Sequence, residues 1–451
     1  MSEIRRPPGP HSFLPGGGLL RMRRDPLALL LDMAQKYGDV SYVRTGDRQI
    51  YLLNHPDYIK DLLVTNSANF VKSIAVQKMK VFLGEGLLTS EGDYHERQRR
   101  LIQPAFHAPR IDAYAQIMAD QTRRVGGGWQ DGQTLDIAKE MTRLTMSIVA
   151  KALFGAELET EAKELGAALT TLLKGFRLFL LPFGDQIVKL PLPVNRRFRQ
   201  AGEQLNRAIG GIIAARHERP SVHDDLLSAL LAARGTEGDG GRMNDEQVRD
   251  EAMTLFVAGH ETTANALAWT WYLLSQHPSV EARFHAELDS ALDGQTPGAA
   301  SLPHLTYTAQ ILMESMRLYP PAWVIGRQTL RDYSVGGYVV PAGAIVFASQ
   351  WAMHHDPRYY PDPFRFDPDR WLPEARAARP RFTYFPFGAG PRVCIGESFA
   401  WTESILVLAI LAQRWKMRLE PGQRIVPLPL VTLRPKHGIR MTLQRRSRAE
   451  H

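Results

Sequence analysis

The sequence predicts a mainly helical fold with a smaller β-rich subdomain, and three patterns indicate it. A continuous helical pattern runs from Asp245 to Gln276, which is about 48 Å at roughly 1.5 Å per residue. Residues 115–218 are also largely helical in pattern, with a break near residues 181–193. Strand-like alternation is confined to short segments, such as residues 40–44 and 49–54.

The composition is that of an ordinary globular protein, because 44% of the 451 residues are hydrophobic and 23% are charged. A formal net charge of +8 suggests an anionic partner. The basic residues do not form runs with interleaved aromatic residues, which are typical of nucleic-acid binding. We therefore expect no nucleic-acid partner, and either a solvated basic surface or an acidic protein partner.

The N-terminal segment has no apolar core, so it is neither a signal peptide nor a membrane anchor. Residues 1–20 are rich in proline and glycine and are expected to form an extended arm ahead of a single domain over residues 21–451. No later window reaches the run of about 18 apolar residues that a transmembrane helix needs. We expect a cytoplasmic protein with no transmembrane anchor.

Secondary structure in the domain begins with a helix at Pro26–Tyr37, followed by the two short strands. The Gly-Asp pair between these strands is a hairpin signal. Residues 336–343 have the pattern of a second hairpin, so β-rich parts are placed at about 38–55 and 333–348. A glycine-rich tract at residues 235–241 is expected to be a flexible loop.

Cys394 is the single cysteine, which excludes internal disulfides and cysteine-rich zinc sites and fits a reducing compartment. A lone cysteine is more often an inert core thiol, but its neighbours indicate otherwise. Glycines in Phe387–Gly396 allow tight turns and close approach of a bulky group. The apolar helical run Ser398–Leu411 follows, and amides at its start favour a thiolate. The loop has the features that present a thiolate to a metal.

This segment matches Phe-x-x-Gly-x-Arg-x-Cys-x-Gly at each defining position and resembles the haem-binding loop of the cytochrome P450 monooxygenases. The resemblance implies a haem-thiolate fold with a long central helix over the haem. It makes Cys394 the axial ligand of the iron, with Phe387 beside the sulfur. By the same resemblance Arg392 contacts a haem propionate, and Gly396 belongs to the cofactor site.

The middle of the long helix, which opens with a capping pair of Asn244 and Gln247, has the sequence Ala-Gly-His-Glu-Thr-Thr from Ala258. Glycine and adjacent threonines weaken a helix interior, and such breaks concentrate at functional sites. The resemblance implies that Ala258 leaves room at the haem, and that Glu261 and Thr262 are catalytic in delivering protons to bound dioxygen. The alternative is that the threonines bond back to the preceding turn.

Basic side chains predict the remaining cofactor contacts. His95 and Arg99 lie four residues apart on one face of a helix, and the resemblance assigns both, with Arg327, to haem propionates. The alternative is a basic helix that faces solvent. Arg97 and Arg100 lie on the opposite face, where we expect an acidic electron donor to dock.

Glu314 and Arg317 lie three residues apart on one helix face. On their own they suggest a surface ion pair worth a few tenths of a kcal/mol. The resemblance joins them to Arg370 in a structural network that braces the haem loop.

Apolar segments at residues 70–92 and 176–183 fall where the family contacts its substrates, although packed core explains them equally well. The candidates for substrate-lining residues are Val81, Phe82, Phe176, Phe179, Leu255, Ala322, Trp323, Val324 and Val431. An apolar substrate of the fatty acid, terpenoid or polyketide class is expected.

The resemblance implies a monooxygenase that contains haem b and inserts one atom of dioxygen into a C–H or C=C bond. We expect a monomer that receives NAD(P)H electrons through a ferredoxin or flavodoxin and its reductase, since the sequence contains no flavin or iron–sulfur domain. Two alternatives stay open. One is a peroxygenase that uses hydrogen peroxide, and the Glu-Thr pair argues against it. The other is a haem-thiolate gas or redox sensor, which needs an output domain.

Overall fold

The computed structural model describes residues 6–10, 17–46, 48–155, 166–172, 175–180, 184–218, 225–232 and 243–446. The chain divides into two compact units, each built from stretches far apart in the sequence. The sheet unit combines Met1–Ala75 with Met313–Cys394, and the helical unit combines Val76–Leu312 with Ile395–His451.

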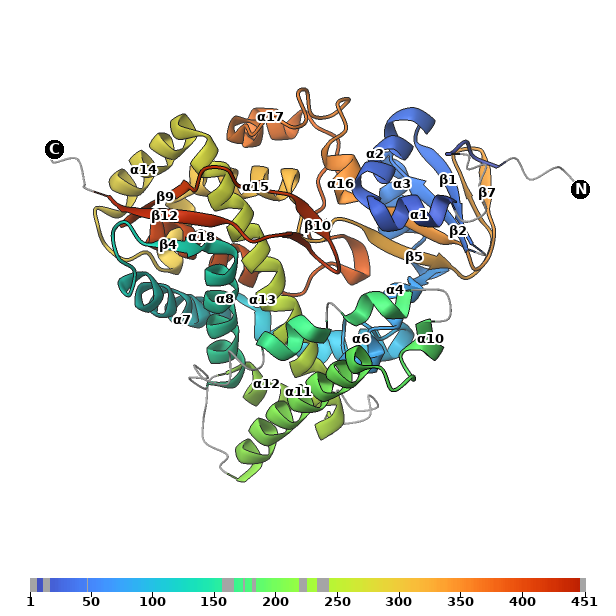
Figure 1. The fold of residues 1–451 in the computed structure, drawn as a ribbon, viewed down its shortest axis with the longest axis horizontal. Coiled ribbons are helices and arrows are strands. Elements are labelled where there is room, and N and C mark those ends of the chain that lie inside the picture. Colours follow the sequence, from blue (N-terminus) through green and yellow to red (C-terminus); the bar gives the residue numbers. More distant parts are fainter. Residues whose placement is uncertain are drawn as a thin grey trace, which may run out of the picture. The chain divides into compact units, whose positions relative to one another are not determined.

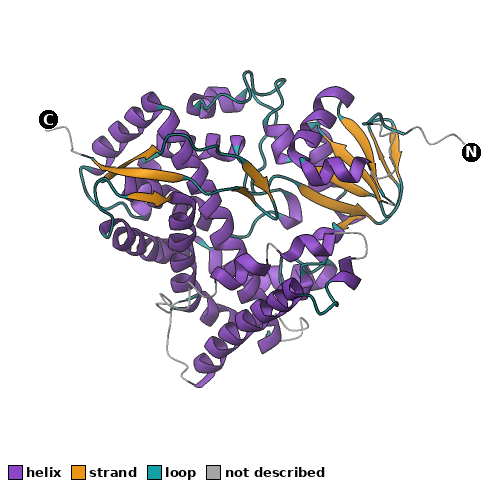
Figure 2. Ribbon diagram, in the orientation of Figure 1, coloured by secondary structure: helices purple, strands orange, loops and turns teal. Residues whose placement is uncertain are grey.

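A five-stranded sheet organises the sheet unit, with the strand order β1-β2-β8-β5-β3. Strands are drawn in orange in Figure 2. Strands β2 and β8 are parallel, and the other neighbours are antiparallel. The first two strands confirm the predicted alternating segments. The strands are β1 Val40–Thr45, β2 Arg48–Leu53, β3 Phe70–Lys72, β5 Ile325–Thr329 and β8 Ile345–Ala348.

Helix α2 (Pro26–Tyr37) has the predicted bounds and is capped by Asp25, whose carboxylate accepts from the amide of Ala28 at 3.0 Å. Its Leu29, Leu30 and Met33 join the core formed with β1, β2 and β8. The other helices of this unit are α1 (Gly17–Arg24), α3 (Pro56–Lys60), a π-helix (Asp61–Thr65), α16 (Gln350–His354) and α17 (Pro373–Ala377).

The extended arm predicted for residues 1–20 is too long, because α1 already begins at Gly17. A Cβ atom on Gly18 would lie 2.4 Å from the carbonyl oxygen of Arg44, so glycine lets this helix approach β1 closely. Farther upstream residues 6–10 belong to no helix or strand, and the carbonyl of Pro8 accepts from the amide of Tyr42 at 2.9 Å.

The second predicted hairpin is present but begins earlier than expected. Strands β6 (Tyr333–Val335) and β7 (Tyr338–Val340) are joined by Gly336 and Gly337, whose φ angles are 58° and 78°. Two consecutive positive φ angles define the turn best suited to antiparallel strands. The predicted hairpin pattern at residues 336–343 begins with the glycine pair, which forms the turn, and β6 lies ahead of it within the predicted β-rich part at 333–348.

Helix α13 (Asp245–Gln276) is the centre of the helical unit and confirms the predicted 32-residue helix (yellow-green in Figure 1). Asn244 accepts from the amide of Gln247 at 2.8 Å, and Gln247 accepts from the amide of Asn244 at 3.0 Å. The helix packs against α8 (Ile137–Phe154), α11 (Pro193–Glu218) and α18 (Glu397–Ala412).

Further α-helices in the described residues include α4 (Ile74–Gln77), α5 (Lys80–Leu83), α6 (Gly92–Ile102), α7 (Ala108–Gly127), α10 (Gly184–Ile187), α12 (Leu226–Ala232), α14 (Pro278–Leu292) and α15 (Thr306–Leu318). Within the part of the chain described above, none of them or of the other helices is both long and apolar enough to cross a membrane. The predicted loop at residues 235–241 lies outside the described residues, as do residues 181–183 of the predicted apolar cluster.

The helical unit contains strands that the sequence analysis placed in the helical remainder. A three-stranded sheet has the order β4-β12-β9, and β10 pairs antiparallel with β11. These strands are short and pair with distant partners, so alternation alone does not reveal them. They are β4 Thr134–Asp136, β9 Trp415–Leu419, β10 Pro427–Pro429, β11 Leu433–Pro435 and β12 Arg440–Arg445.

Candidate active site

Cys394 lies at the end of a loop of the sheet unit that its backbone holds in shape. Gly388 and Gly390 have φ angles of 73° and 70°, a region that favours glycine. A Cβ atom on Gly390 would lie 2.0 Å from the carbonyl oxygen of Leu63, so only glycine fits. The amide of Cys394 donates to the carbonyl of Phe387 at 3.0 Å. The cysteine itself is exposed, so a fixed loop presents its thiol to a ligand.

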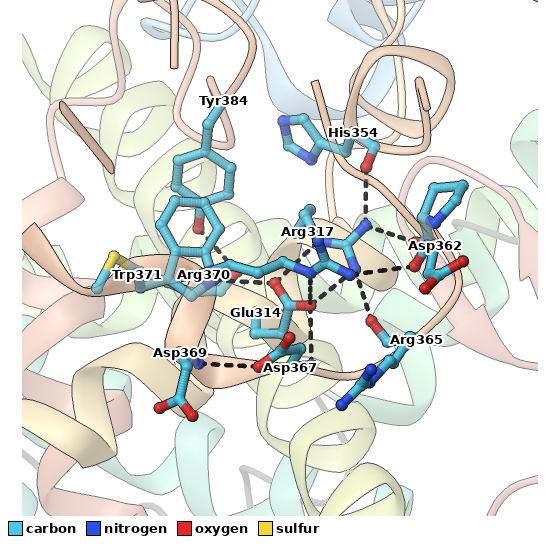
Figure 3. A network of polar contacts seen from close by, with 12 residues as sticks. Glu314, Arg317, His354, Asp362, Arg365, Asp367, Asp369, Arg370, Trp371 and Tyr384 are labelled. Carbon is cyan, nitrogen blue, oxygen red and sulfur yellow. Dashed lines mark hydrogen bonds and ion pairs between the residues drawn. The ribbon is translucent and has the colours of Figure 1, made fainter. Parts of the chain in front are cut away.

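Glu314, Arg317 and Arg370 lie together in the sheet unit (Figure 3). The carboxylate of Glu314 accepts from Arg317 Nη2 at 2.7 Å and Nε at 2.8 Å. Arg370 Nε lies 3.4 Å from the same carboxylate, and the indole of Trp371 donates to it at 2.9 Å. Both Glu314 and Arg317 are fully buried, so this is an interior network and not the surface pair that their spacing alone suggests.

Arg317 extends this network to the carbonyl of His354, as Figure 3 shows. Its Nη1 donates to the carbonyl of His354 at 2.9 Å. The ring Nε2 of His354 then accepts from the amide of Phe385 at 3.2 Å, two residues before Phe387. Burial, the neighbouring His355 and Arg317 lower the pKa of His354 well below its usual range, so the ring stays neutral and can accept. A continuous set of contacts therefore runs from α15 to the loop.

The other site candidates of the sheet unit are partly buried. Arg392 lies in the 3₁₀ turn Gly390–Arg392, and Arg327 lies on β5. Trp323 and Val324 pack against the core between α2 and the sheet, and Ala322 is half-buried beside them in the sequence. At least part of this predicted substrate-lining segment therefore has a packing role.

In the helical unit, α6 carries the predicted propionate contacts. His95 is buried, with Nδ1 3.3 Å from the hydroxyl of Ser90, and Arg99 is half-buried one turn later. On the opposite face Arg100 is exposed but Arg97 is half-buried. The predicted docking face is thus only partly open to a partner.

One face along the middle of α13 is only half-buried. Between Glu251 and Trp271, all of which are described, every residue is buried except Leu255, Ala258, Gly259 and Thr262. Spacings of three, four and seven residues place these four on a single helical face. The predicted dioxygen-side residues Ala258 and Thr262, and the substrate candidate Leu255, therefore share an open stripe along an otherwise buried helix.

The two adjacent threonines differ in their partners. The hydroxyl of Thr262 donates to the carbonyl of Ala258 at 2.8 Å, which is the back-bonding arrangement considered as the alternative. Thr263 is buried and lies close to Glu403 of α18. Burial raises the pKa of Glu403 well above its usual range and so favours the neutral carboxyl group.

Glu261 is buried and faces strand β11. Its carboxylate forms an ion pair with Arg434 and accepts from the hydroxyl of Thr432 at 2.7 Å. Burial raises the pKa of Glu261, but Arg434 and the hydrogen bonds outweigh burial, so the pKa falls below its usual range. The structure thus pairs Glu261 with the C-terminal hairpin and pairs the hydroxyl of Thr262 with its own helix.

Three of the predicted substrate-lining residues pack against one another. Phe82, Phe176 and Phe179 are buried and form an aromatic cluster with Phe198 of α11, with ring centroids 5.2–6.2 Å apart. This is the packed-core arrangement left open by the sequence. Val81, in contrast, is 61% exposed.

Two further candidates lie near the C-terminal half of the helical unit. Val431 is half-buried in the turn between β10 and β11. Gly396 immediately precedes α18, and a Cβ atom there would make ordinary contact with Phe106 at 3.7 Å. The start of α18 therefore lies three residues after Cys394 along the chain.

The sequence analysis did not identify His354, Asn265, Trp269, Thr432 or Arg434. For Asn265 and Trp269 a signal exists, because Glu261, Asn265 and Trp269 place hydrogen-bonding groups at every fourth residue of an apolar helix. The partners on β11 and the role of His354 depend on contacts between distant segments, so no local pattern marks them.

The chain belongs to the cytochrome P450 family, whose family model, described as "Cytochrome P450", matches residues 7–442. The chain is 40% identical to cyclooctatin synthase of Streptomyces melanosporofaciens, over 94% of this chain and 93% of that protein. It is also 40% identical to cyclooctat-9-en-7-ol 5-monooxygenase of the same organism, over 92% of each. Pentalenene oxygenase of Streptomyces avermitilis is 34% identical over 97% of this chain and 99% of that protein.

A crystal structure of the cytochrome P450DA heme domain matches 98% of this chain and 98% of that chain, with a TM-score of 0.89 and 26% identity. The predicted family and mainly helical fold are therefore confirmed. The protein is a haem-thiolate monooxygenase, an oxidoreductase that incorporates oxygen from dioxygen.

Proposed function

We propose that this P450 hydroxylates a cyclic terpenoid, with electrons supplied by separate redox proteins. The substrate class is supported by the similarity to cyclooctat-9-en-7-ol 5-monooxygenase and pentalenene oxygenase, which align over nearly the full chain. Hydroxylation is supported by the first of these names, which states oxidation at a ring position of an alcohol.

The observation that carries this proposal is the open stripe on α13, which combines an apolar lining with one hydroxyl. Leu255 and Ala258 offer apolar contact to a hydrocarbon, and Thr262 adds a hydroxyl on the same face. The helix is buried on its other sides, so this half-buried face is the part of it that can contact a bound molecule. Such a face suits a bound group that needs space, apolar contact and a proton source.

The residues of the chain fit haem b as the cofactor. An exposed thiol on a glycine-shaped loop is the donor that a haem-thiolate centre requires, so Cys394 would hold the iron. His95, Arg99, Arg327 and Arg392 carry the N–H donors that the two haem propionates would accept from. Phe387 and Gly396 would complete the loop beside the sulfur. When bound, haem supplies the activation of dioxygen.

Thr262 would contribute a proton at its hydroxyl oxygen. Its hydrogen bond to Ala258 holds the hydroxyl on the open face, and rotation about χ1 redirects the donor from the carbonyl to a bound molecule. Glu261, adjacent in sequence, would resupply that proton through water. The same pair argues against peroxide as the oxidant, because peroxide brings its own protons.

Reconstituted turnover tests the proposal. Purified ferric protein would be supplied with NADPH, a ferredoxin and its reductase, and with a cyclic terpenoid such as pentalenene. A hydroxylated product that carries ¹⁸O from ¹⁸O₂ supports the proposal. Equal product from hydrogen peroxide without the redox proteins would instead identify a peroxygenase, and absence of product from terpenoids together with oxidation of fatty acids would overturn the substrate class.

A further inference from the structure

Three side chains in a row on α13 bind the hairpin formed by β10 and β11. Glu261, Asn265 and Trp269 follow one another at intervals of four residues, so they share one helical face. The indole of Trp269 donates to the carbonyl of Leu433 at 3.0 Å, and Nδ2 of Asn265 lies 3.2 Å from the hydroxyl of Thr432. The hairpin is therefore fixed to successive turns of the helix.

Glu261 is the charged end of this row. A single carboxylate oxygen, Oε1, accepts hydrogen bonds from the hydroxyl of Thr432 at 2.7 Å and from the guanidinium of Arg434. The same oxygen lies 3.3 Å from Nδ2 of Asn265. The side chains of Glu261 and Arg434 are only 8% and 19% exposed. A buried carboxylate with several donors on one oxygen is anchored in place, and solvent screens its ion pair weakly.

The surrounding groups leave Arg434 as the permanent cation at this carboxylate. On the same helix His260 is buried, and burial lowers its pKa, so it is neutral near pH 7. From α8 the hydroxyl of Thr145 donates to the carbonyl of His260 at 3.0 Å. Glu403 of α18 lies close to Thr263, and burial raises its pKa, which favours its neutral form.

We propose that Arg434 and Thr432 are positioning residues for Glu261, which keep its carboxylate ionised and bound to the β10–β11 hairpin. The ion pair with Arg434 and the hydrogen bond from Thr432 must break before Glu261 can take up a proton. The inference rests on the proposed role of Glu261 in resupplying Thr262. On release the carboxylate takes one proton from solvent, and it becomes a carboxylate again when it passes that proton on. The turn before β11 contains Val431, a proposed substrate contact, so a molecule that moves this turn also loosens the hold on Glu261.

Infrared difference spectroscopy of the ferric holoenzyme measures the protonation of Glu261 without turnover. The band of the protonated carboxyl group is recorded as pH falls and is assigned by its loss in Glu261→Gln. Removing a nearby opposite charge raises a carboxyl pKa by roughly 1–3 units, so in Arg434→Gln the protonation midpoint should rise by that amount. Arg434→Lys should restore most of the wild-type midpoint, and Thr432→Val should raise it by less than Arg434→Gln.

Arg418→Gln is the control, because Arg418 also forms an arginine–glutamate pair between a strand and a helix, with Glu281 of α14, through two bonds of 2.8 and 2.7 Å. This variant should leave the midpoint of Glu261 unchanged. The proposal is overturned if Arg434→Gln and Thr432→Val both keep the wild-type midpoint, or if Arg418→Gln shifts it equally. If Arg434→Gln does not bind haem, Thr432→Val and Arg434→Lys still decide the question. Since the midpoint is measured without substrate or reductase, the result is independent of whether the terpenoid proposal holds.

Discussion

The loop that ends at Cys394 and the middle turns of α13 are held by different kinds of contact. The loop is fixed by its backbone, through the positive φ angles of Gly388 and Gly390 and the amide of Cys394 on the carbonyl of Phe387. The α13 turn is regular helix, and its special features are side-chain partners and one half-buried face. Backbone contacts give a rigid support for a metal ligand, whereas side-chain contacts can be exchanged during a reaction cycle.

Breaking the buried network of Glu314, Arg317 and Arg370 should have the largest effect on stability. Glu314→Ala leaves Arg317 buried without its carboxylate, and breaking a buried ion pair commonly costs about 3–5 kcal/mol. We expect a matching loss of unfolding free energy in urea and little haem-loaded protein. Asp120→Ala is the control, since its pair with Arg123 is exposed and is worth about 0–1 kcal/mol. Normal stability but no activity in Glu314→Ala would instead indicate a direct role in the reaction.

Changes on α13 should affect chemistry more than stability. Because proton delivery by a positioned group is commonly worth roughly 10²-fold or more, Thr262→Ala should divert most reducing equivalents to hydrogen peroxide while substrate binding persists. Thr263→Ala is the matched control, because Thr263 faces Glu403 and not the open stripe. Product formed per NADPH consumed is the measurement. Equal coupling in Thr262→Ala and the wild type would remove Thr262 from the proton path.

A smaller effect should appear in the pH dependence of the unfolding free energy, through His355 close to Arg317. Burial and the nearby Arg317 lower the pKa of His355 to about 3, so the unfolded chain binds a proton below its own pKa of about 6.5 while the folded protein does not. His355 therefore supports folding fully above about pH 6.5, and this support is lost as pH falls towards 3, by up to about 1.4 kcal/mol per pH unit.

His355→Phe tests this dependence, because phenylalanine keeps the stacking on Phe364, whose ring centroid lies 4.7 Å away. The unfolding free energy of the variant should fall less steeply between pH 6.5 and pH 5 than that of the wild type. Parallel curves for the two proteins would show that this histidine does not contribute to acid unfolding.

The smallest effect is expected at the surface of α6. Arg100 is exposed, so Arg100→Glu should weaken steering of an acidic donor and slow the first electron transfer by a few-fold at low salt, roughly the scale of a single peripheral charge. Stopped-flow reduction by a ferredoxin measures this rate. The control is Arg143→Glu on α8, which is also exposed and should have no effect. A rate unchanged by Arg100→Glu would reject this docking face.

The contrast between the two regions also explains what the sequence could reveal. The cysteine loop depends on glycines at fixed positions, and α13 on an unbroken helical pattern with a capping pair, so both were predicted from local sequence. Of the buried network, the sequence analysis predicted only Glu314, Arg317 and Arg370. His354, which joins Arg317 to Phe385, was missed because its partners are 37 and 31 residues away in the chain.

The substrate side was predicted least well, since apolar side chains look alike in sequence whether they line a site or fill a core. Phe82, Phe176 and Phe179 pack against Phe198, whereas Val81 is exposed. The pairing of Glu261 with β11 depends on a hairpin about 170 residues later, at Thr432 and Arg434, with separations of 171 and 173 residues. Local periodicity contains no information about such contacts.

The central claim is that the backbone-held loop presents Cys394 as the thiolate ligand of haem iron. The absorption spectrum of the reduced protein with carbon monoxide tests it directly, because a thiolate opposite carbon monoxide shifts the Soret band strongly to the red. The wild type should show this red-shifted band. Cys394→Ala reconstituted with haem should lose it, and a Cys394→Ala protein that binds haem and keeps the red-shifted band would contradict the assignment.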